Sequence, residues 1–256
     1  MTNDNYLANL LASQNLTTAE LDTLRSLRED VEHCLMLLAG RPRFYYGGSY
    51  GKKTMIRERY DLDIVAYWPQ ETSYTLQGIF EATGQQLQKK WQILNRKTVA
   101  WEIPFSNNYK GFHIDVVPGR SLDSAYQYAN LYRTDTGTSL KTSIKTHIDT
   151  VRGSNRRDVI RLLKLWKERK KVQFKKSFLL EMMAIDGTKN IVGLEQQLIS
   201  AFIFIRDNIM TYQAKDPANS NNSLSDDLSS VSRFLIQNAA QNAIDMKTWD
   251  SVFSMY

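Results

Sequence analysis

Residues 47–68, GGSYGKKTMIRERYDLDIVAYW, decide the fold of this 256-residue chain. They open with a Gly-Gly-Ser turn and close with a strand expected over residues 61–68. Because side chains alternate along a strand, Asp61 and Asp63 point to one face while Leu62 and Ile64 enter the core. Two carboxylates so close together repel each other unless a cation lies between them. The pair predicts a cation site, although a single D-x-D is also compatible with a strand end that protrudes into solvent.

A third carboxylate stands in a later apolar stretch, 112–117 (FHIDVV). If this strand lies beside residues 61–67, Asp115 joins the acidic pair on the same sheet face. Three carboxylates then surround a site for hard cations such as Mg²⁺. Two such ions about 4 Å apart can activate an attacking hydroxyl and stabilise a departing pyrophosphate. His113 is expected to be a strand residue without chemistry, because two-metal phosphoryl transfer needs no imidazole.

Gly47, Gly48 and Ser49 precede the acidic pair at the entrance to a short helix expected to end at about Arg57. Glycines let a backbone approach a ligand closely, and free amides at a helix N-terminus favour phosphate. A Gly-Gly before a helix is by itself only a turn. Its interpretation as a phosphate site therefore depends on the acids that follow.

The charge of the chain is concentrated in one segment. Residues 156–176, RRDVIRLLKLWKERKKVQFKK, hold ten of the 33 Lys and Arg and two of the 27 Asp and Glu, a local net charge of +8 within a total of +6. The segment is either a solvated helix face or an electrostatic lining for phosphates.

Composition limits the class of protein. A hydrophobic fraction of 42% and a charged fraction of 23% are ordinary for a globular protein. No apolar run approaches the roughly 18 residues of a membrane span, and the N-terminus lacks the pattern of a secretory signal. The single cysteine, Cys34, cannot form an internal disulfide or seed a zinc site. We therefore expect a reducing, cytoplasmic location and no membrane partner.

The remaining pattern divides the chain into three segments: residues 1–40, with a helix that braces two lobes; residues 41–120, a mixed core; and residues 121–256, a helical subdomain. The first helix opens with a capping box, Thr17 with Glu20. The fold class is therefore predicted to be α+β. In detail we expect helices at 17–39, 74–92, 156–171, 177–184, 194–210 and 227–246, strands at 97–104 and 112–117, a turn at 106–111 and a loop at 216–227.

These residues resemble the DNA polymerase beta superfamily of nucleotidyltransferases. Its pattern is a Gly-Ser turn and short helix, a strand with D-x-D, and a third Asp on a later strand, which GGSYGKKTMIRERYDLDI and HIDVVP match. RDVIRLLKLWKERKKVQFKKSFLLEMM, and DPANSNN before a helix, resemble the back half of 2′-5′ oligoadenylate synthetases, cyclic GMP-AMP synthase and the bacterial cyclic-oligonucleotide synthases of anti-phage defence. The resemblance runs from about residue 40 to 245. It implies a nucleotidyltransferase mixed sheet core with helices, followed by a C-terminal helical, oligoadenylate synthetase-like subdomain.

The resemblance also implies a role for each site residue. Asp61 and Asp63 would ligate two Mg²⁺ (or Mn²⁺) ions. Asp115 would hold the ion at the attacking hydroxyl and could accept its proton. Gly48 and Ser49 would bind the triphosphate of the donor nucleotide.

Three residues of the back half complete the implied site. Lys164 would reach the β- or γ-phosphate, Ser177 would add a phosphate contact, and Phe178 would lie near the base. From the residues alone, Lys164 is equally a surface lysine and Ser177 a helix N-cap. In the implied site, the charged segment around Lys164 would face a triphosphate.

Three functions share this pattern. The first is a synthase that joins nucleoside triphosphates into a cyclic or short linear oligonucleotide second messenger in anti-phage defence, with release of pyrophosphate. The second is template-independent addition of nucleotides to RNA or tRNA 3′ ends, for which residues 156–176 would supply a basic track. The third is an inactive nucleotide sensor, which the presence of all three acids disfavours. The expected partners are nucleoside triphosphates, and an RNA acceptor or an activating partner stays open.

Overall fold

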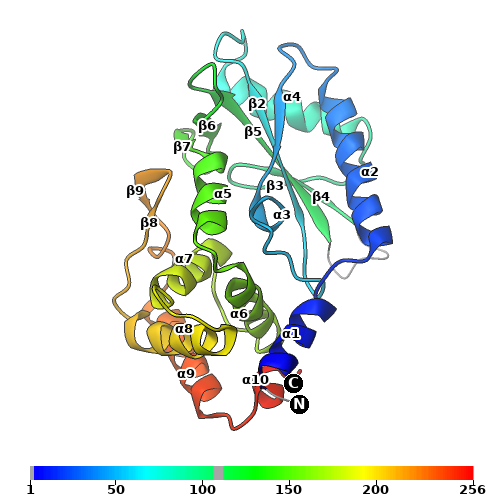
Figure 1. Ribbon diagram of the computed structural model, residues 1–256. Helices are drawn as coiled ribbons and strands as arrows, with labels where there is room; N and C mark the ends of the chain where they lie inside the picture. The colour runs from blue at the N-terminus through cyan, green and yellow to red at the C-terminus, as the bar shows by residue number, and fades with distance from the viewer. Residues whose placement is uncertain (1–2, 106–111, 256) are drawn as a thin grey trace. The chain divides into compact units, whose positions relative to one another are not determined.

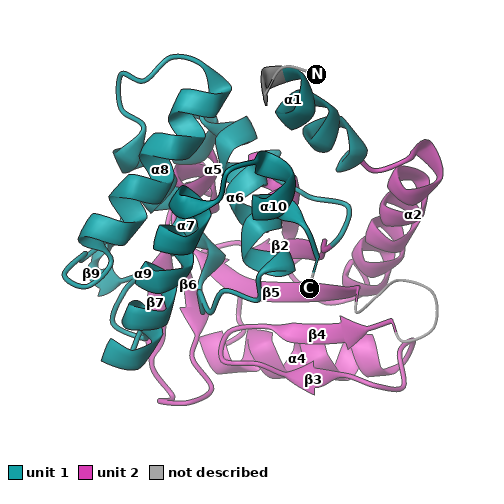
Figure 2. Ribbon diagram, turned by 90° about the horizontal axis from the view of Figure 1, so that it is seen from below, with its two compact units in different colours: residues 1–15, 53–58, 149–256 teal, residues 16–52, 59–148 magenta. Residues whose placement is uncertain are grey.

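The computed structural model describes residues 3–105 and 112–255, so the turn expected at 106–111 lies outside the described residues. The chain forms two compact units, which Figure 2 shows in different colours. The sheet unit comprises residues 16–52 and 59–148, and the helical unit comprises residues 1–15, 53–58 and 149–256. A mixed sheet with helices, followed by a helical region, confirms the predicted α+β class.

The sheet unit is built on one mixed sheet with the strand order β1-β2-β5-β4-β3, and β6 and β7 continue from β5 (Figure 1). The strands of this sheet among the described residues are β1 (Arg43–Tyr46), β2 (Leu62–Trp68), β3 (Asn95–Arg96), β4 (Trp101–Pro104), β5 (His113–Ser121), β6 (Ala129–Tyr132) and β7 (Ser139–Thr142). Its helices are α2 (Thr18–Leu35), α3 (Gly48–Lys52) and α4 (Leu76–Gln88). Strands β2 and β5 are parallel, and each other neighbouring pair is antiparallel.

Helix α4 covers one face of this sheet. Ile64 on β2 and Val116 on β5 are register partners and are fully buried. Trp101, the partner of Val116 on β4, packs its ring against Phe80 of α4 and donates a 2.9 Å hydrogen bond to the Phe80 carbonyl. Ile64 and Val116, which were expected to enter the core, therefore lie on the face that α4 covers. The alternate residues, which include Asp63 and Asp115, lie on the other face.

Helix α2 begins with the predicted capping box. The Thr17 side chain accepts a 3.2 Å hydrogen bond from the Glu20 amide, and the Glu20 carboxylate accepts one of 2.7 Å from the Thr17 amide. The helix ends at Leu35, earlier than the predicted 39, and it packs on α4 within the sheet unit. The N-terminal segment 1–40 is therefore divided, because helix α1 (Asn3–Ser13) belongs to the helical unit.

The helical unit has its own apolar core, centred on α6, where Trp166 packs edge-on against Phe202. Its elements among the described residues are α1, α6 (Arg157–Arg169), α7 (Ser177–Gly187), α8 (Leu194–Asn208), β8 (Lys215–Asp216), β9 (Asn219–Ser223), α9 (Ser230–Asp245) and α10 (Trp249–Phe253). Helix α5 (Ile144–Gly153) begins among the residues of the sheet unit and ends among those of the helical unit. The expected loop at 216–227 includes the short hairpin β8–β9.

Most of the basic segment 156–176 is occupied by contacts inside the helical unit. Arg161 donates to the carbonyls of Met55 and Leu11, and Arg169 pairs with Glu58. Seven of its ten basic side chains form such hydrogen bonds or ion pairs, namely Arg156, Arg161, Lys164, Lys167, Arg169, Lys170 and Lys176. The segment is thus neither a purely solvated face nor, in the main, an open basic surface.

The boundary between the units differs from the one expected near residue 120. Strand β5 continues through Pro118 to Ser121, and β6 and β7 extend the sheet to Thr142. Pro118 follows the stretch paired with β4 (113–116) and precedes the stretch paired with β6 (119–121). The edge of β5 away from β2 has no partner residue at this position, and a proline is tolerated at such a gap. The proline therefore marks a change of neighbouring strand within the sheet.

Candidate active site

The three predicted aspartates lie together on one face of the sheet. Asp63 on β2 is the register partner of Asp115 on the parallel strand β5, so the strands are neighbours as expected. Asp61 immediately precedes β2, and its Oδ2 lies 3.7 Å from Nε2 of His113. The same nitrogen lies 3.8 Å from Oδ2 of Asp115. A third β strand contributes Glu102, which is the register partner of Asp115 on β4. These four carboxylates, Asp61, Asp63, Glu102 and Asp115, form the acidic face.

The acidic face disfavours the ionised form of its central carboxylates. Burial, followed by the charges of Asp61 and Asp115, raises the pKa of Asp63 to about 7, although Lys52 and His113 oppose the shift. Burial also raises the pKa of Asp115, against the opposing hydrogen bonds from Lys97. A divalent cation would favour the charged forms again, because opposite charge at close range lowers a carboxyl pKa.

Gly48 packs directly on the Asp63 carboxyl. Its φ is +50°, and a Cβ atom at this position would lie 1.7 Å from Oδ2 of Asp63. The adjacent Gly47 amide donates a 2.9 Å hydrogen bond to the Asp63 carbonyl, and the Gly51 amide donates one of 2.7 Å to the Gly47 carbonyl. Only glycine combines the left-handed backbone with this approach. The Gly-Ser turn expected from the sequence is therefore fixed against the acidic face.

Ser49 has a buried hydroxyl with no hydrogen-bond partner within the described part of the chain. A buried hydroxyl without a partner is costly, so the atom is suited to a ligand oxygen. Oxygen-rich carboxylates beside it are the ligands that Mg²⁺ and Mn²⁺ prefer. The donor set and the unpaired hydroxyl both fit divalent ions with a phosphate.

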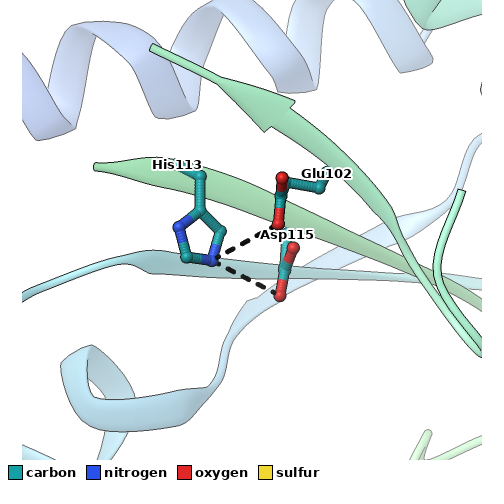
Figure 3. Close-up of side chains that lie close together, drawn as sticks. All are labelled: Glu102, His113 and Asp115. Carbon is teal, nitrogen blue, oxygen red and sulfur yellow. Dashed lines mark ion pairs between the residues drawn. The ribbon is translucent and has the colours of Figure 1, made fainter. Parts of the chain in front are cut away.

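Figure 3 shows how Glu102, His113 and Asp115 converge. One ligand atom from each lies within 4.8 Å of the other two, which is a group able to hold a metal ion. His113, expected to have no chemistry, thus lies at the edge of the acidic face.

Lys97 contributes an ammonium group to this cluster. Its Nζ lies 2.7 and 2.9 Å from the two oxygens of Asp115 and 2.6 Å from Oε2 of Glu102. Burial lowers the pKa of Lys97, but the hydrogen bonds to Asp115 and Glu102 outweigh it and raise the pKa above its usual value. The hydrogen bonds from Lys97 and Asn95 likewise lower the pKa of Glu102, against the effect of burial.

Sequence reasoning missed Lys97 and Glu102 as site residues. The stretch 97–104 was expected to be one strand, whereas β3 ends at Arg96 and β4 begins at Trp101. The intervening turn is closed by the Lys97 amide, which donates to the Ala100 carbonyl at 2.9 Å. The alternation of WEIP, with Glu102 between the buried Trp101 and Ile103, was the available signal.

Lys164, Ser177 and Phe178 belong to the helical unit. The Lys164 ammonium is buried, 2.5 Å from Oε1 of the fully buried Glu181 and 2.8 Å from Oγ1 of Thr54. Ser177 is the first residue of α7 and accepts a 3.2 Å hydrogen bond from Lys167, while Lys176 holds the N-cap position. Phe178 packs at the edge of the helical core. Lys164 is therefore not the surface lysine of the simpler interpretation.

The described helices include none that is long and apolar enough to cross a membrane. No protein-family model matches the sequence, and no curated protein sequence matches it.

Solved structures match nearly the whole chain. CdnC of E. coli MS115-1 with ATP is 21% identical, covers 98% of both chains and has a TM-score of 0.74. CdnG of Bradyrhizobium diazoefficiens, a CD-NTase in complex with GTP, is 14% identical over 96% of this chain and 93% of that one, with a TM-score of 0.73. DncV of Vibrio cholerae, a cyclic AMP-GMP synthase, matches at 13% identity over 95% and 90% of the two chains, with a TM-score of 0.73. The chain therefore has the fold of the bacterial CD-NTases.

Proposed function

We propose that the protein is a metal-dependent nucleotidyltransferase that joins nucleoside triphosphates into a cyclic or short linear oligonucleotide. The observation that carries the proposal is that Asp63 and Asp115 are register partners on parallel strands, and that Gly48 packs directly on the Asp63 carboxyl. The fold supports it, because the matched structures include cyclic dinucleotide synthases. A cytoplasmic second-messenger role in anti-phage defence is part of the proposal.

The acidic face would hold two Mg²⁺ or Mn²⁺ ions through Asp61, Asp63 and Asp115. Bound there, the ions supply Lewis-acid stabilisation of the attacking hydroxyl and of the departing pyrophosphate. Asp115 would take the proton of the attacking hydroxyl, whose oxygen forms a bond to the α-phosphorus while the bond to the β-phosphate oxygen breaks. Gly48 keeps Asp63 in place, and the Ser49 hydroxyl would donate to a phosphate oxygen of the donor nucleotide.

Lys164, Ser177 and Phe178 are proposed to bind the donor nucleotide from the helical unit. For Lys164 this requires an exchange, because its ammonium is now paired with Glu181. A triphosphate offers more negative charge than one carboxylate and is a competent replacement partner.

Addition of nucleotides to RNA 3′ ends is the alternative activity. It needs an open basic track whose affinity falls steeply with salt. The side chains of Arg161, Lys164 and Arg169 are engaged in contacts within the helical unit, which removes them from an open basic track. We therefore favour synthesis from nucleotides alone.

The test is a product assay with labelled nucleoside triphosphates, singly and mixed, with Mg²⁺ or Mn²⁺, followed by phosphatase treatment. A small phosphatase-resistant product without added RNA supports the proposal, and label transferred only to added tRNA contradicts it. Asp61→Asn with Asp63→Asn should abolish product formation. Asp22→Asn with Asp30→Asn, two aspartates of α2 whose ion pairs are solvent-exposed, is the charge-matched control and should leave product formation intact.

One matched structure is a complex of CdnC with HORMA-deltaN. We propose an activating partner of that kind as the explanation if the purified chain is silent with both nucleotides and RNA. Recovery of product on adding such a partner would retain the nucleotidyltransferase assignment, and continued silence would favour the inactive-sensor hypothesis.

A further inference from the structure

Lys97 occupies the oxygens that a divalent ion at Asp115 would need. Its ammonium contacts both carboxylate oxygens of Asp115, at 2.7 and 2.9 Å. An ion that binds Asp115 closely must take at least one of these oxygens from the lysine, because a cation at bonding distance repels an ammonium on the same atom. The two cations are therefore competitors for one carboxylate.

The position of Lys97 is fixed by its backbone. Its amide closes the β3–β4 turn on Ala100, and its carbonyl accepts a 3.1 Å hydrogen bond from Oγ1 of Thr134. The side chain thus starts from an anchored turn and reaches the acidic face from the β4 side. This anchoring keeps the ammonium near Asp115 at high effective concentration.

Glu102 can remain the ion-pair partner of Lys97 after the lysine is displaced from Asp115. Its Oε2 already lies 2.6 Å from the Lys97 Nζ, and it is held by a 2.6 Å hydrogen bond from Asn95. Lys97 can therefore release Asp115 and keep its pairing with Glu102, so the ammonium need not leave the cluster. The exchange leaves no buried charge without a partner.

We propose that Lys97 is a built-in competitor for the divalent ion at Asp115, which holds this carboxylate in the metal-free protein and moves to Glu102 when the ion binds. Lys97 is thus a positioning residue for Asp115. The inference rests on the proposed function, because it takes Asp115 as a metal ligand.

The test measures Mn²⁺ affinity from the free-ion signal in electron paramagnetic resonance at pH 8.0. Lys97→Gln should bind Mn²⁺ roughly tenfold more tightly than the wild type, the scale of one charge-assisted hydrogen bond. Lys97→Arg keeps the charge and should stay near the wild type. Arg96→Gln removes a neighbouring charge that pairs with Glu81 instead, and it should change the affinity less than twofold. Equal or weaker binding by Lys97→Gln overturns the inference.

Two further measurements separate the possible failures. Asp115→Asn should weaken Mn²⁺ binding, and if the wild type binds no Mn²⁺ or this variant binds it unchanged, the proposed metal site fails and this inference fails with it. Acetylation of Lys97, followed by peptide mass spectrometry, should rise when Mn²⁺ is added to the wild type. Lys90, which pairs with Asp30, is the internal reference. If Asp115 proves to bind Mn²⁺ but the labelling of Lys97 does not change, the displacement alone is wrong.

Discussion

At Gly48, the addition of one methyl group should reduce activity much more than it reduces stability. Its backbone lies in the left-handed region at φ +50°, which costs a non-glycine residue about 1–2 kcal/mol. An alanine Cβ would also lie 1.7 Å from Oδ2 and 2.6 Å from Cγ of Asp63. Because the Asp63 carboxyl is the end of a short side chain, it relieves the clash by rotating away. We expect Gly48→Ala to lower the free energy of unfolding by about 1–2 kcal/mol. Activity should fall about 100-fold or more, as displacement of a positioned group by 1 Å does.

Two other glycines supply the controls for Gly48→Ala. Gly137 has a φ of +70°, and no neighbouring atom of the described residues would lie within 4 Å of a Cβ there, so Gly137→Ala carries the backbone strain alone. It should cost a similar unfolding free energy and keep full activity. Gly153, at the end of α5, has neither feature, and Gly153→Ala should leave stability unchanged or raise it by up to about 1 kcal/mol.

The assay combines urea unfolding at pH 7.5 with product formation under saturating Mg²⁺ and nucleotide. The prediction is a pattern: Gly48→Ala and Gly137→Ala agree in stability and differ in activity by two orders of magnitude. If Gly48→Ala retains activity within about threefold of Gly137→Ala, Asp63 does not depend on the turn for its position, and the reasoning is refuted.

Three further predictions concern charge and packing. The pKa of Asp63 is raised to about 7 from an ordinary value near 3.9, so its contribution to stability is present below pH 4 and lost as pH rises through 7. In urea unfolding, the metal-free protein should therefore lose at most about 4 kcal/mol of unfolding free energy over this range. Saturating Mn²⁺ should remove this pH dependence. Lys164→Met leaves the buried Glu181 without its ion-pair partner and should lower the free energy of unfolding by about 3–5 kcal/mol. The double variant Lys164→Met with Glu181→Leu should lower it less than either single change, and additive effects would contradict the coupling of the two residues. Gly84→Ala would place a Cβ 2.4 Å from the Trp101 ring and should cost about 1–3 kcal/mol, measured by thermal melting with Gly153→Ala as the reference.

The alternation of side chains along two strands predicted the aspartates of the acidic face but not Glu102 or Lys97. In DLDI and FHIDVV the aspartates alternate with buried residues, because side chains alternate along a strand. The apolar run after Asp63 is buried on both faces of the sheet, and Val65 and Tyr67 share the face of Asp63. The register that sets Asp63 opposite Asp115 depends on which strands become neighbours, and periodicity does not encode this. The sequence argument expected only that the two strands lie side by side, because three carboxylates on one sheet face would form a cation site, and it left the register open.

The missed elements have weak local patterns. Strands β6 and β7 are four residues each, and β7 alternates between exposed and half-buried side chains, so neither gives a long apolar signal. Lys97 lies in the turn between β3 and β4. The apolar residues that follow it led to the prediction of one continuous strand over residues 97–104. Its role depends on a cross-strand contact with β5, which no local reading of residues 97–104 contains.

The charged side chains of the two units differ in how well they are paired with opposite charges. In the helical unit the least exposed cations of the basic segment are paired with acids of the same unit, as Lys164–Glu181 and Arg169–Glu58 illustrate. The acidic face of the sheet unit brings four carboxylates together. Lys97 and Lys52 are two ammonium groups that act on them. Lys97 pairs with Asp115 and Glu102, while burial, followed by the charges of Asp61 and Asp115, raises the pKa of Asp63 to about 7. A carboxylate kept in this state by a fixed glycine turn is a liability for folding. A divalent ion at the proposed site would remove that liability, because opposite charge at close range favours the ionised carboxylates.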